Sequence, residues 1–218
     1  LESYSAFFKG RLPEQYEIIV VVNYCSDRTE QIARQAAEVF GSISVVVETE
    51  CIGKGGAVLM GFRTATGEYI GFVDADGATP APSFSQLLEK IGNDGCAIGS
   101  RWIEGAQVNP QQSLMRRIAS RLLNRVFVRG LFGLQVYDSQ CGAKLFSRDV
   151  LLPLLPELNE RGWAFDIDIL CRVKRNGSSI REWPIEWHHV SGNPINFMLM
   201  SMQMLASVWR VKRALVRM

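Results

Sequence analysis

Several residue types and patterns are scarce in this sequence, and each absence argues against a class of protein. The 218 residues include five cysteines and two histidines, with no C-x-x-C pair and no His close to a Cys in sequence. This pattern argues against a disulfide framework and against a structural zinc site, and it favours the cytosol. No run approaches 18 apolar residues, so no ordinary transmembrane helix is predicted. The first residues also lack the basic and apolar regions of a secretory signal peptide.

The familiar nucleotide-binding fingerprints are also missing. No G-x-x-x-x-G-K-[ST] occurs, and the glycine-rich segment Gly53-Lys54-Gly55-Gly56 lacks the third glycine of the dinucleotide-binding motif, where Val58 stands instead. Two explanations of this segment remain open. Its glycines allow close backbone approach while Lys54 supplies a charge for a diphosphate, or the segment is a plain glycine turn.

Acidic residues are scarce in the second half of the chain, although the formal net charge is only +2. Residues 1–109 carry 8 Lys/Arg and 14 Asp/Glu, whereas residues 110–218 carry 16 and 8. No acidic residue occurs in 105–137, and the spacing of Arg117, Arg121 and Arg125 predicts one basic helix face. The two halves are therefore expected to do different things, and the segment at about 112–133 is predicted to be a basic amphipathic helix.

Short apolar runs alternate with helical patterns through the first half. The composition, with 47% hydrophobic and 21% charged residues, is not that of a disordered chain. The length of 218 residues is enough for one sizeable core. Alternating strands and helices predict an α/β fold, with a mostly parallel central sheet, helices on both faces and ligands at the carboxyl ends of the strands. The predicted strands are 18–22, 44–47, 69–73, 96–99 and 180–187, and the predicted helices are 27–41, 56–66, 83–91 and 164–174.

Asp74-Ala75-Asp76 directly follows the predicted strand 69–73. In extended backbone, residues i and i+2 point the same way, so the two carboxylates supply half of a site for a hard cation. Mg²⁺ or Mn²⁺ accepts such oxygens and bridges to phosphate oxygens. The alternative is an Asp-rich turn. Asn23 and Asp27 follow the strand 18–22, where they suit either contact with a base or ribose or simple helix capping.

Six motifs in order carry a resemblance to a known family. They are N-Y-C-S-D-R-T from residue 23, G-K-G-G-A-V from 53, G-E-Y-I-G-F-V-D-A-D-G-A-T from 67, I-G-S-R from 98, D-S-Q-C-G-A-K-L-F from 138 and W-A-F-D-I-D-I-L from 163. In order and spacing they resemble the family 2 glycosyltransferases of the GT-A fold over roughly residues 16–190. Within that family the sequence is most similar to polyprenyl-phosphate hexosyltransferases, namely the dolichyl-phosphate β-glucosyltransferases and dolichol-phosphate mannose synthases.

The resemblance implies a nucleotide-sugar site and a catalytic carboxylate. It implies that Asp166 occupies the place of the general base, with Asp138 as the other catalytic candidate, and that the central sheet lacks the family's first strand. It also implies that Asp74 and Asp76 hold Mg²⁺ or Mn²⁺ on the donor diphosphate. The implied donor-binding residues are Asn23, Asp27, Lys54, Gly55, Asp74, Asp76 and Arg101, and the partners for the acceptor phosphate are Arg117, Arg121 and Lys144.

The implied activity is an inverting transfer of a hexose from a nucleotide sugar, with UDP-glucose favoured over GDP-mannose, to a polyprenyl phosphate. Residues 1–190 would form the catalytic domain. Residues 191–218 would form an apolar and basic helix at a membrane interface, which predicts a peripheral protein on the cytoplasmic side. The alternatives are a sugar-phosphate nucleotidyltransferase and a non-catalytic remnant that binds nucleotide sugars or membranes. No RNA-binding motif is present, so no nucleic-acid partner is expected.

Overall fold

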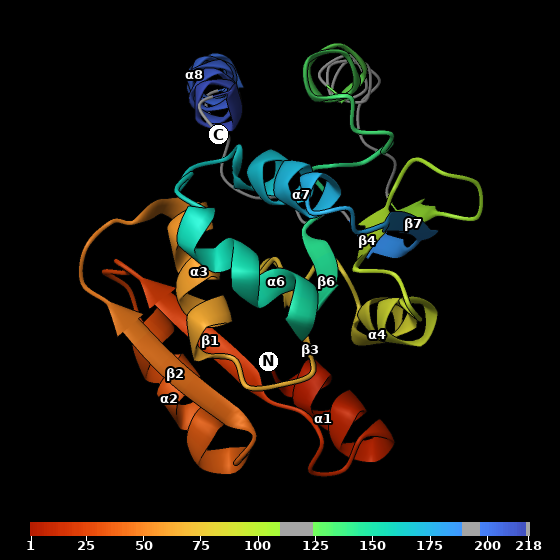
Figure 1. Cartoon of the computed structure of the whole chain (residues 1–218). Coiled ribbons are helices and arrows are strands. Elements are labelled where there is room, and N and C mark those ends of the chain that lie inside the picture. The colour runs from red at the N-terminus through yellow and green to blue at the C-terminus, as the bar shows by residue number, and fades with distance from the viewer. Residues whose placement is uncertain (110–123, 189–196, 217–218) are drawn as a thin grey trace.

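The computed structural model describes residues 1–109, 124–188 and 197–216, and strands and helices alternate through most of it (Figure 1). The helices predicted at 27–41, 56–66, 83–91 and 164–174 are confirmed, with ends shifted by a few residues. The helices are α1 (Glu2–Arg11), α2 (Thr29–Val39), α3 (Gly53–Thr64), α4 (Ala81–Lys90), the π-helix η1 (Asn124–Leu131), α6 (Arg148–Leu154), the short 3-10 helix η2 (Leu155–Glu157), α7 (Phe165–Arg175) and α8 (Phe197–Val216).

The strands form three separate sheets. The first pairs β1 with β2 in parallel, the second has the order β3-β6-β4-β7, and the third pairs β5 with β8 in parallel. All five predicted strands are confirmed, the last of them divided into β7 and β8. The strands are β1 (Ile18–Asn23), β2 (Ile43–Glu48), β3 (Tyr69–Val73), β4 (Cys96–Ser100), β5 (Gln107–Asn109), β6 (Ala143–Ser147), β7 (Ile180–Pro184) and β8 (Glu186–His188).

The strand β6 was not predicted, and it changes the character of the central sheet. It lies between β3 and β4 and runs antiparallel to both, whereas β4 and β7 are parallel. Its sequence, A-K-L-F-S, places a charged residue at a core position and therefore lacks the pattern of a buried strand. The prediction of parallel pairing thus holds for three of the five strand pairs and fails at the two pairs that β6 makes.

The strand β1 is less buried than the run of β-branched residues predicted. Only Val22 is buried, and Ile18 to Val21 are each partly exposed. The physical reason is the pairing: β1 bonds to β2 along one edge, and no strand among the described residues pairs with its other edge or with the outer edge of β3. Among the described residues, β1 and β3 therefore belong to separate sheets.

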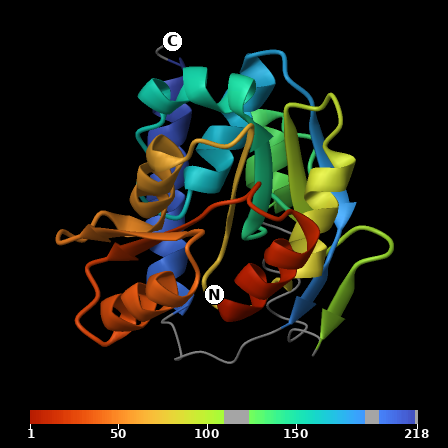
Figure 2. The same ribbon diagram turned by 90° about the horizontal axis from the view of Figure 1, so that it is seen from below.

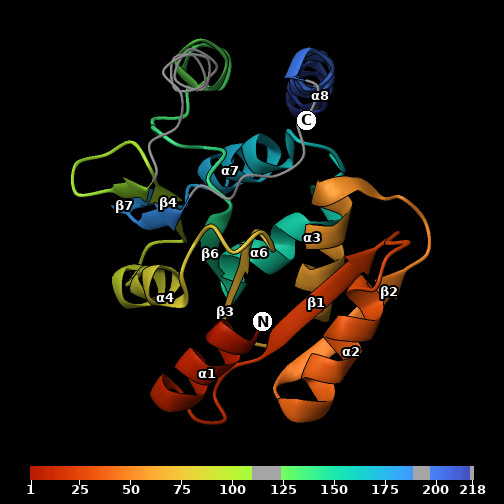
Figure 3. The same ribbon diagram turned by 180° about the vertical axis from the view of Figure 1, so that it is seen from behind.

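Helices cover both faces of the four-stranded sheet, as predicted for an α/β fold. Side chains alternate between the two faces along each strand. On β4, Ile98 packs in a cluster with α3, α6, α7 and α8, while Ala97 packs in a second cluster with α4. Figure 1 shows α7 between this sheet and α8, and Figures 2 and 3 show α1 beside α4. Tyr4 and Arg11 hold α1 there, through Thr79 and Glu89.

Candidate active site

The turn that follows β3 presents two carboxylates at the carboxyl end of that strand. The main chain of Asp74 donates a hydrogen bond to the carbonyl of Gly142 at 2.8 Å, which continues the pairing between β3 and β6. A side chain at Gly142 would collide with Asp74, because its Cβ would lie 2.0 Å from Oδ2. Asp76 is exposed, and its Oδ1 accepts a bond from the amide of Ala78 at 2.9 Å. The glycine therefore provides the space that the Asp74 carboxylate occupies.

Lys54 connects this turn to the predicted general base. It lies at the start of α3, and its Nζ is 2.9 Å from Oδ1 of Asp74 and 3.6 Å from Oδ2 of Asp166. Burial lowers the pKa of Lys54, but the attraction of Asp166 and Asp74 outweighs burial and leaves the pKa raised. The ammonium group is thus a fixed cation between two carboxylates from different elements.

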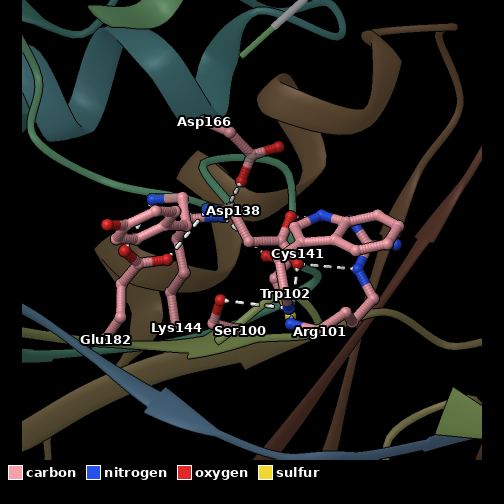
Figure 4. Close-up of polar contacts among 9 residues, drawn as sticks. Ser100, Arg101, Trp102, Asp138, Cys141, Lys144, Asp166 and Glu182 are labelled. Atoms are coloured by element: carbon pink, nitrogen blue, oxygen red, sulfur yellow. Dashed lines mark hydrogen bonds and ion pairs between the residues drawn. The ribbon is translucent and has the colours of Figure 1, made fainter. Parts of the chain in front are cut away.

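Asp166 also forms an ion pair with a second lysine, Lys144. Asp166 lies in the first turn of α7 and is 1% exposed, and Lys144 on β6 is fully buried. Nζ of Lys144 lies 2.5 Å from Oδ1 of Asp166 and donates a further bond to the carbonyl of Cys141 at 2.6 Å (Figure 4). Because both charges are buried, each depends on the other for compensation. The predicted direct contact of Lys144 with an acceptor phosphate is therefore not supported, since its ammonium group is enclosed.

Arg101 and Asp138 form another buried ion pair near β4 (Figure 4). Nε and one terminal nitrogen of the guanidinium group donate to the two carboxylate oxygens, at 2.8 Å each, and the amide of Arg101 adds a bond at 2.9 Å. Burial lowers the pKa of Arg101, but the charge and hydrogen bond of Asp138 outweigh it and leave the pKa raised. Asp138 is 2% exposed, so its carboxylate is fully engaged as a structural partner. The catalytic role of Asp138 stays a prediction, since Asp166 is equally buried and ion-paired.

The glycine-rich segment is fixed by side chains and main chain from other elements. The side chain of Asn23, at the end of β1, donates to the carbonyl of Gly53 and accepts from the amide of Ile52, both at 3.2 Å. A Cβ at Gly55 would lie 2.6 Å from Cβ of Phe165, so only glycine allows this approach to α7. Asn23 therefore positions the segment that carries Lys54.

Asp27 is exposed and serves the beginning of α2. Its Oδ1 accepts bonds from the amide and the hydroxyl of Thr29, at 3.0 and 2.5 Å, and the side-chain bond, then the backbone bond, lowers its pKa. This contact is a local turn before α2. The N-cap of the helix is Arg28 and has no side-chain cap bond, so the capping alternative offered for Asp27 is not what the structure shows. Arg117 and Arg121 lie outside the described residues.

The structure thus brings together Asn23, Lys54, Gly55, Asp74 and Asp166, with Asp76 in the adjoining turn. Sequence reasoning missed Glu182, whose carboxylate accepts bonds from the amides of Tyr137 and Asp138 at 2.6 and 2.8 Å. Burial raises the pKa of Glu182. No motif marked Glu182, because its partners lie 44 and 45 residues away in the chain.

The arrangement suits the binding of a phosphate group beside a carboxylate. Asp74 and Asp76 offer hard oxygen ligands for a divalent cation, and the Lys54 ammonium already occupies the cationic position next to Asp74. Among the described residues no group of three or more His, Cys, Asp or Glu side chains gathers, so a metal here would need further oxygens from a ligand such as a diphosphate.

Comparison with solved structures identifies the fold class. The structure of glucosyl-3-phosphoglycerate synthase from Mycobacterium tuberculosis, in complex with Mn²⁺, UDP and phosphoglyceric acid, matches with a TM-score of 0.65 at 19% sequence identity. The match covers 96% of this chain and 73% of that chain. At this level of identity the likeness establishes the fold, which is the GT-A fold of nucleotide-sugar glycosyltransferases.

The sequence comparisons then establish the family. The model for glycosyl transferase family 2 matches residues 6–154, about two thirds of the chain, and the chain belongs to this family. The dolichyl-phosphate beta-glucosyltransferase of Saccharomyces cerevisiae is 29% identical over 231 residues, covering 96% of this chain and 68% of that protein. The Drosophila melanogaster protein of the same name is 33% identical over 190 residues, covering 83% and 58%. The chain thus spans roughly six to seven tenths of the length of these relatives.

Proposed function

We propose that this glycosyltransferase moves glucose from UDP-glucose to a dolichyl-type polyprenyl phosphate, with inversion at the sugar carbon. The similar proteins named for dolichyl-phosphate glucosylation support the two substrates. The observation that carries the proposal is the chain of charges Asp74–Lys54–Asp166–Lys144, which joins the predicted donor site to the predicted base.

On the donor side, Asp74 and Asp76 would hold a divalent cation against the diphosphate. The related glucosyl-3-phosphoglycerate synthase contains Mn²⁺ together with UDP. The cation would supply charge stabilisation for the departing nucleoside diphosphate. Lys54, whose Nζ lies 2.9 Å from Oδ1 of Asp74, would add a positive charge of the protein beside the same phosphates.

On the acceptor side, Asp166 needs to do little proton transfer. A phosphate monoester has a second pKa near 6, so the acceptor is largely ionised at neutral pH. The main demand is to bring an anionic nucleophile to the sugar beside an anionic leaving group, which makes position and charge screening decisive. Lys144 fixes the Asp166 carboxylate in one orientation, and we assign the direct contact with the acceptor phosphate to Arg117 and Arg121.

We further propose that α8 contacts the membrane that carries the acceptor, with residues 1–190 as the catalytic unit and 191–218 as the interfacial part. One face of α8 is outward, with Trp209 67% and Val216 72% exposed beside the exposed Arg213. Aromatic and basic residues in this combination suit the interface of an anionic bilayer. Among the described residues no helix has the length and apolar character needed to cross a membrane. The five free cysteines suit the reducing, cytoplasmic side.

The transfer assay compares two donors. The chain is incubated with dolichyl phosphate, Mn²⁺ and either radiolabelled UDP-glucose or radiolabelled GDP-mannose, and the lipid is extracted. We expect label in the lipid from UDP-glucose and its loss in Asp76→Asn, while Glu38→Gln, an exposed substitution on α2, retains activity. Label from GDP-mannose alone would replace the glucosyltransferase proposal with the mannosyltransferase alternative, and no labelled lipid from either donor would contradict both.

The membrane contact is tested by sedimentation with vesicles. We expect the double variant Trp209→Ala/Arg213→Gln to bind vesicles containing about 30% phosphatidylserine at least tenfold more weakly than the unaltered chain, since one basic residue near an anionic surface contributes about 1 kcal/mol and the indole adds apolar burial. Lys9→Gln, on the distant helix α1, is the matched control for lost charge. Equal binding by the double variant and the control would refute a role for this face of α8.

A further inference from the structure

The segment between η2 and α7 connects α8 to the glycine-rich segment, and nothing in the proposed chemistry uses this connection. Glu160 lies in this segment and is 7% exposed, which is unusual for a carboxylate unless it has a partner. Its Oε1 accepts a bond from the amide of Gly162 at 2.9 Å. The remaining partner comes from a helix 50 residues further along the chain.

That partner is Arg210 on α8. Its Nε lies 3.1 Å from Oε2 of Glu160, and one of its terminal nitrogens lies 3.0 Å from Oε1. The same terminal nitrogen donates to the hydroxyl of the buried Ser207 at 2.6 Å, which orients the guanidinium group although the Arg210 side chain is 61% exposed. Two parallel charge-assisted bonds of this kind define geometry as well as attraction. The bond with Glu160 also raises the pKa of Arg210.

The helix that carries Arg210 is itself anchored. Met204, Val208 and Val211 are buried in the main core cluster, which also contains side chains of α7. They recur at the spacing of one helix face, so they set the rotation of α8 about its axis. The backbone of α8 that carries Arg210 is therefore held in place by these buried side chains.

The main chain around Glu160 contacts the glycine-rich segment. The amide of Gly56 donates to the carbonyl of Arg161 at 3.3 Å. A Cβ at Gly53, whose φ is +74°, would lie 2.5 Å from that carbonyl oxygen, and a Cβ at Gly55 would lie 2.7 Å from the carbonyl oxygen of Glu160. Because Gly53 and Gly55 have no side chains, their backbone packs directly against the backbone of Glu160 and Arg161. A shift of the Glu160 backbone would therefore displace the backbone that carries Lys54.

We propose that the Glu160–Arg210 pair is a positioning device for the donor site, through which α8 holds the backbone of residues 53–56 in the shape that binds the donor diphosphate. The pair acts through Lys54 and does not touch substrate. The proposal rests on the proposed function, because it assumes that residues 53–56 bind a nucleoside diphosphate. It adds a dependence of donor affinity on α8, a helix that we place at the membrane and away from the reacting atoms.

The test compares Glu160→Gln and Arg210→Gln with Arg175→Gln. Arg175 also contacts α8, through a bond to the carbonyl of Leu215, but it does not touch the segment around Glu160, so its substitution is a matched control. The first readout is hydrogen–deuterium exchange of the amides in residues 53–56. The second is the affinity for UDP in the presence of Mn²⁺, measured by calorimetry, and the third is the KM for UDP-glucose.

We expect faster exchange at 53–56, and about tenfold weaker UDP binding and higher donor KM, in both variants of the pair, with the KM for dolichyl phosphate unchanged. Arg210→Lys should recover part of the UDP affinity, because it restores the charge with one bond in place of two. Exchange and UDP affinity equal to those of Arg175→Gln would overturn the proposal. Failure of the unaltered chain to make glucosyl lipid would defeat the proposed function, but exchange and UDP binding would still decide the role of the pair.

Discussion

Replacing Lys144 with methionine tests whether Asp166 depends on its buried partner. Methionine has a similar length and no charge, so the variant Lys144→Met retains volume while it removes the ammonium group 2.5 Å from Oδ1 of Asp166. In the part of the chain that the structure describes, the carboxylate, 1% exposed, then keeps only the more distant ammonium of Lys54, 3.6 Å from Oδ2, as an ion-pair partner. The variant therefore leaves a buried negative charge poorly compensated.

The size of the effect follows from the distance and the burial. With an effective dielectric constant of about 20, two unit charges 2.5 Å apart attract by about 7 kcal/mol. Part of this attraction offsets the cost of removing both charges from water, and the net loss on removing one partner of a buried pair is about 3–5 kcal/mol. We expect Lys144→Met to lower the free energy of unfolding by about 3 kcal/mol, the low end of this range, because the charge of Lys54 remains. This loss is a large part of the roughly 5–15 kcal/mol by which domains are stable.

Urea unfolding, followed by tryptophan fluorescence, measures this loss. The double variant Lys144→Met/Asp166→Asn removes the uncompensated charge, so we expect it to recover at least about 1 kcal/mol relative to the single variant. Lys9→Met removes an exposed lysine and should change the free energy of unfolding by less than about 0.5 kcal/mol. A single variant as stable as the unaltered chain, or a double variant less stable than the single, would refute the pairing argument.

Two further predictions concern the glycine beneath Asp74 and the cysteines. Gly142→Ala should raise the Mn²⁺ concentration needed for half-maximal transfer by about tenfold, because the added Cβ would displace the Asp74 carboxylate. Gly41→Ala, at a position with open space around it, should behave as the unaltered chain. Equal metal dependence of the two variants would contradict this prediction. Iodoacetamide at pH 8 should label the exposed Cys25 and Cys51 in the native protein, as read by mass spectrometry, and label at a buried thiol would contradict the packing. Burial raises the pKa of the thiols of Cys96, Cys141 and Cys171, which are protected in the native protein. For Cys141 and Cys171 the pKa rises to about 12.

The regular part of the fold could be predicted because its signals are local. The β-branched run at 18–22 depends on neighbours in sequence, and it was confirmed as the strand β1. The strand β6 could not be predicted, because its lysine is buried only through a partner on α7 that lies 22 residues away. The assignment of Lys144 to the acceptor phosphate came from the family resemblance, and it did not anticipate the burial of this lysine.

In the candidate site, too, the features with local signals could be predicted and those formed by long-range contacts could not. The turn with Asp74 and Asp76 and the segment around Lys54 could be predicted from their composition, and the structure joins Lys54 to Asp74. The engagement of Asp138 by Arg101, 37 residues apart, and of Glu160 by Arg210, 50 residues apart, could not be predicted. Two opposite charges far apart in sequence carry no signal that they will meet, since long-range packing decides it.

The most direct test of the central claim is the turnover of Asp166→Asn in glucosyl-lipid formation, with UDP-glucose and dolichyl phosphate both saturating. If the Asp166 carboxylate, held by Lys54 and Lys144, orders the reacting groups, the kcat of the variant should fall at least about 100-fold, while UDP and Mn²⁺ still bind within a few-fold of the unaltered chain. A kcat that stays within a few-fold of the unaltered chain would contradict the assignment of this site as the place of glucose transfer.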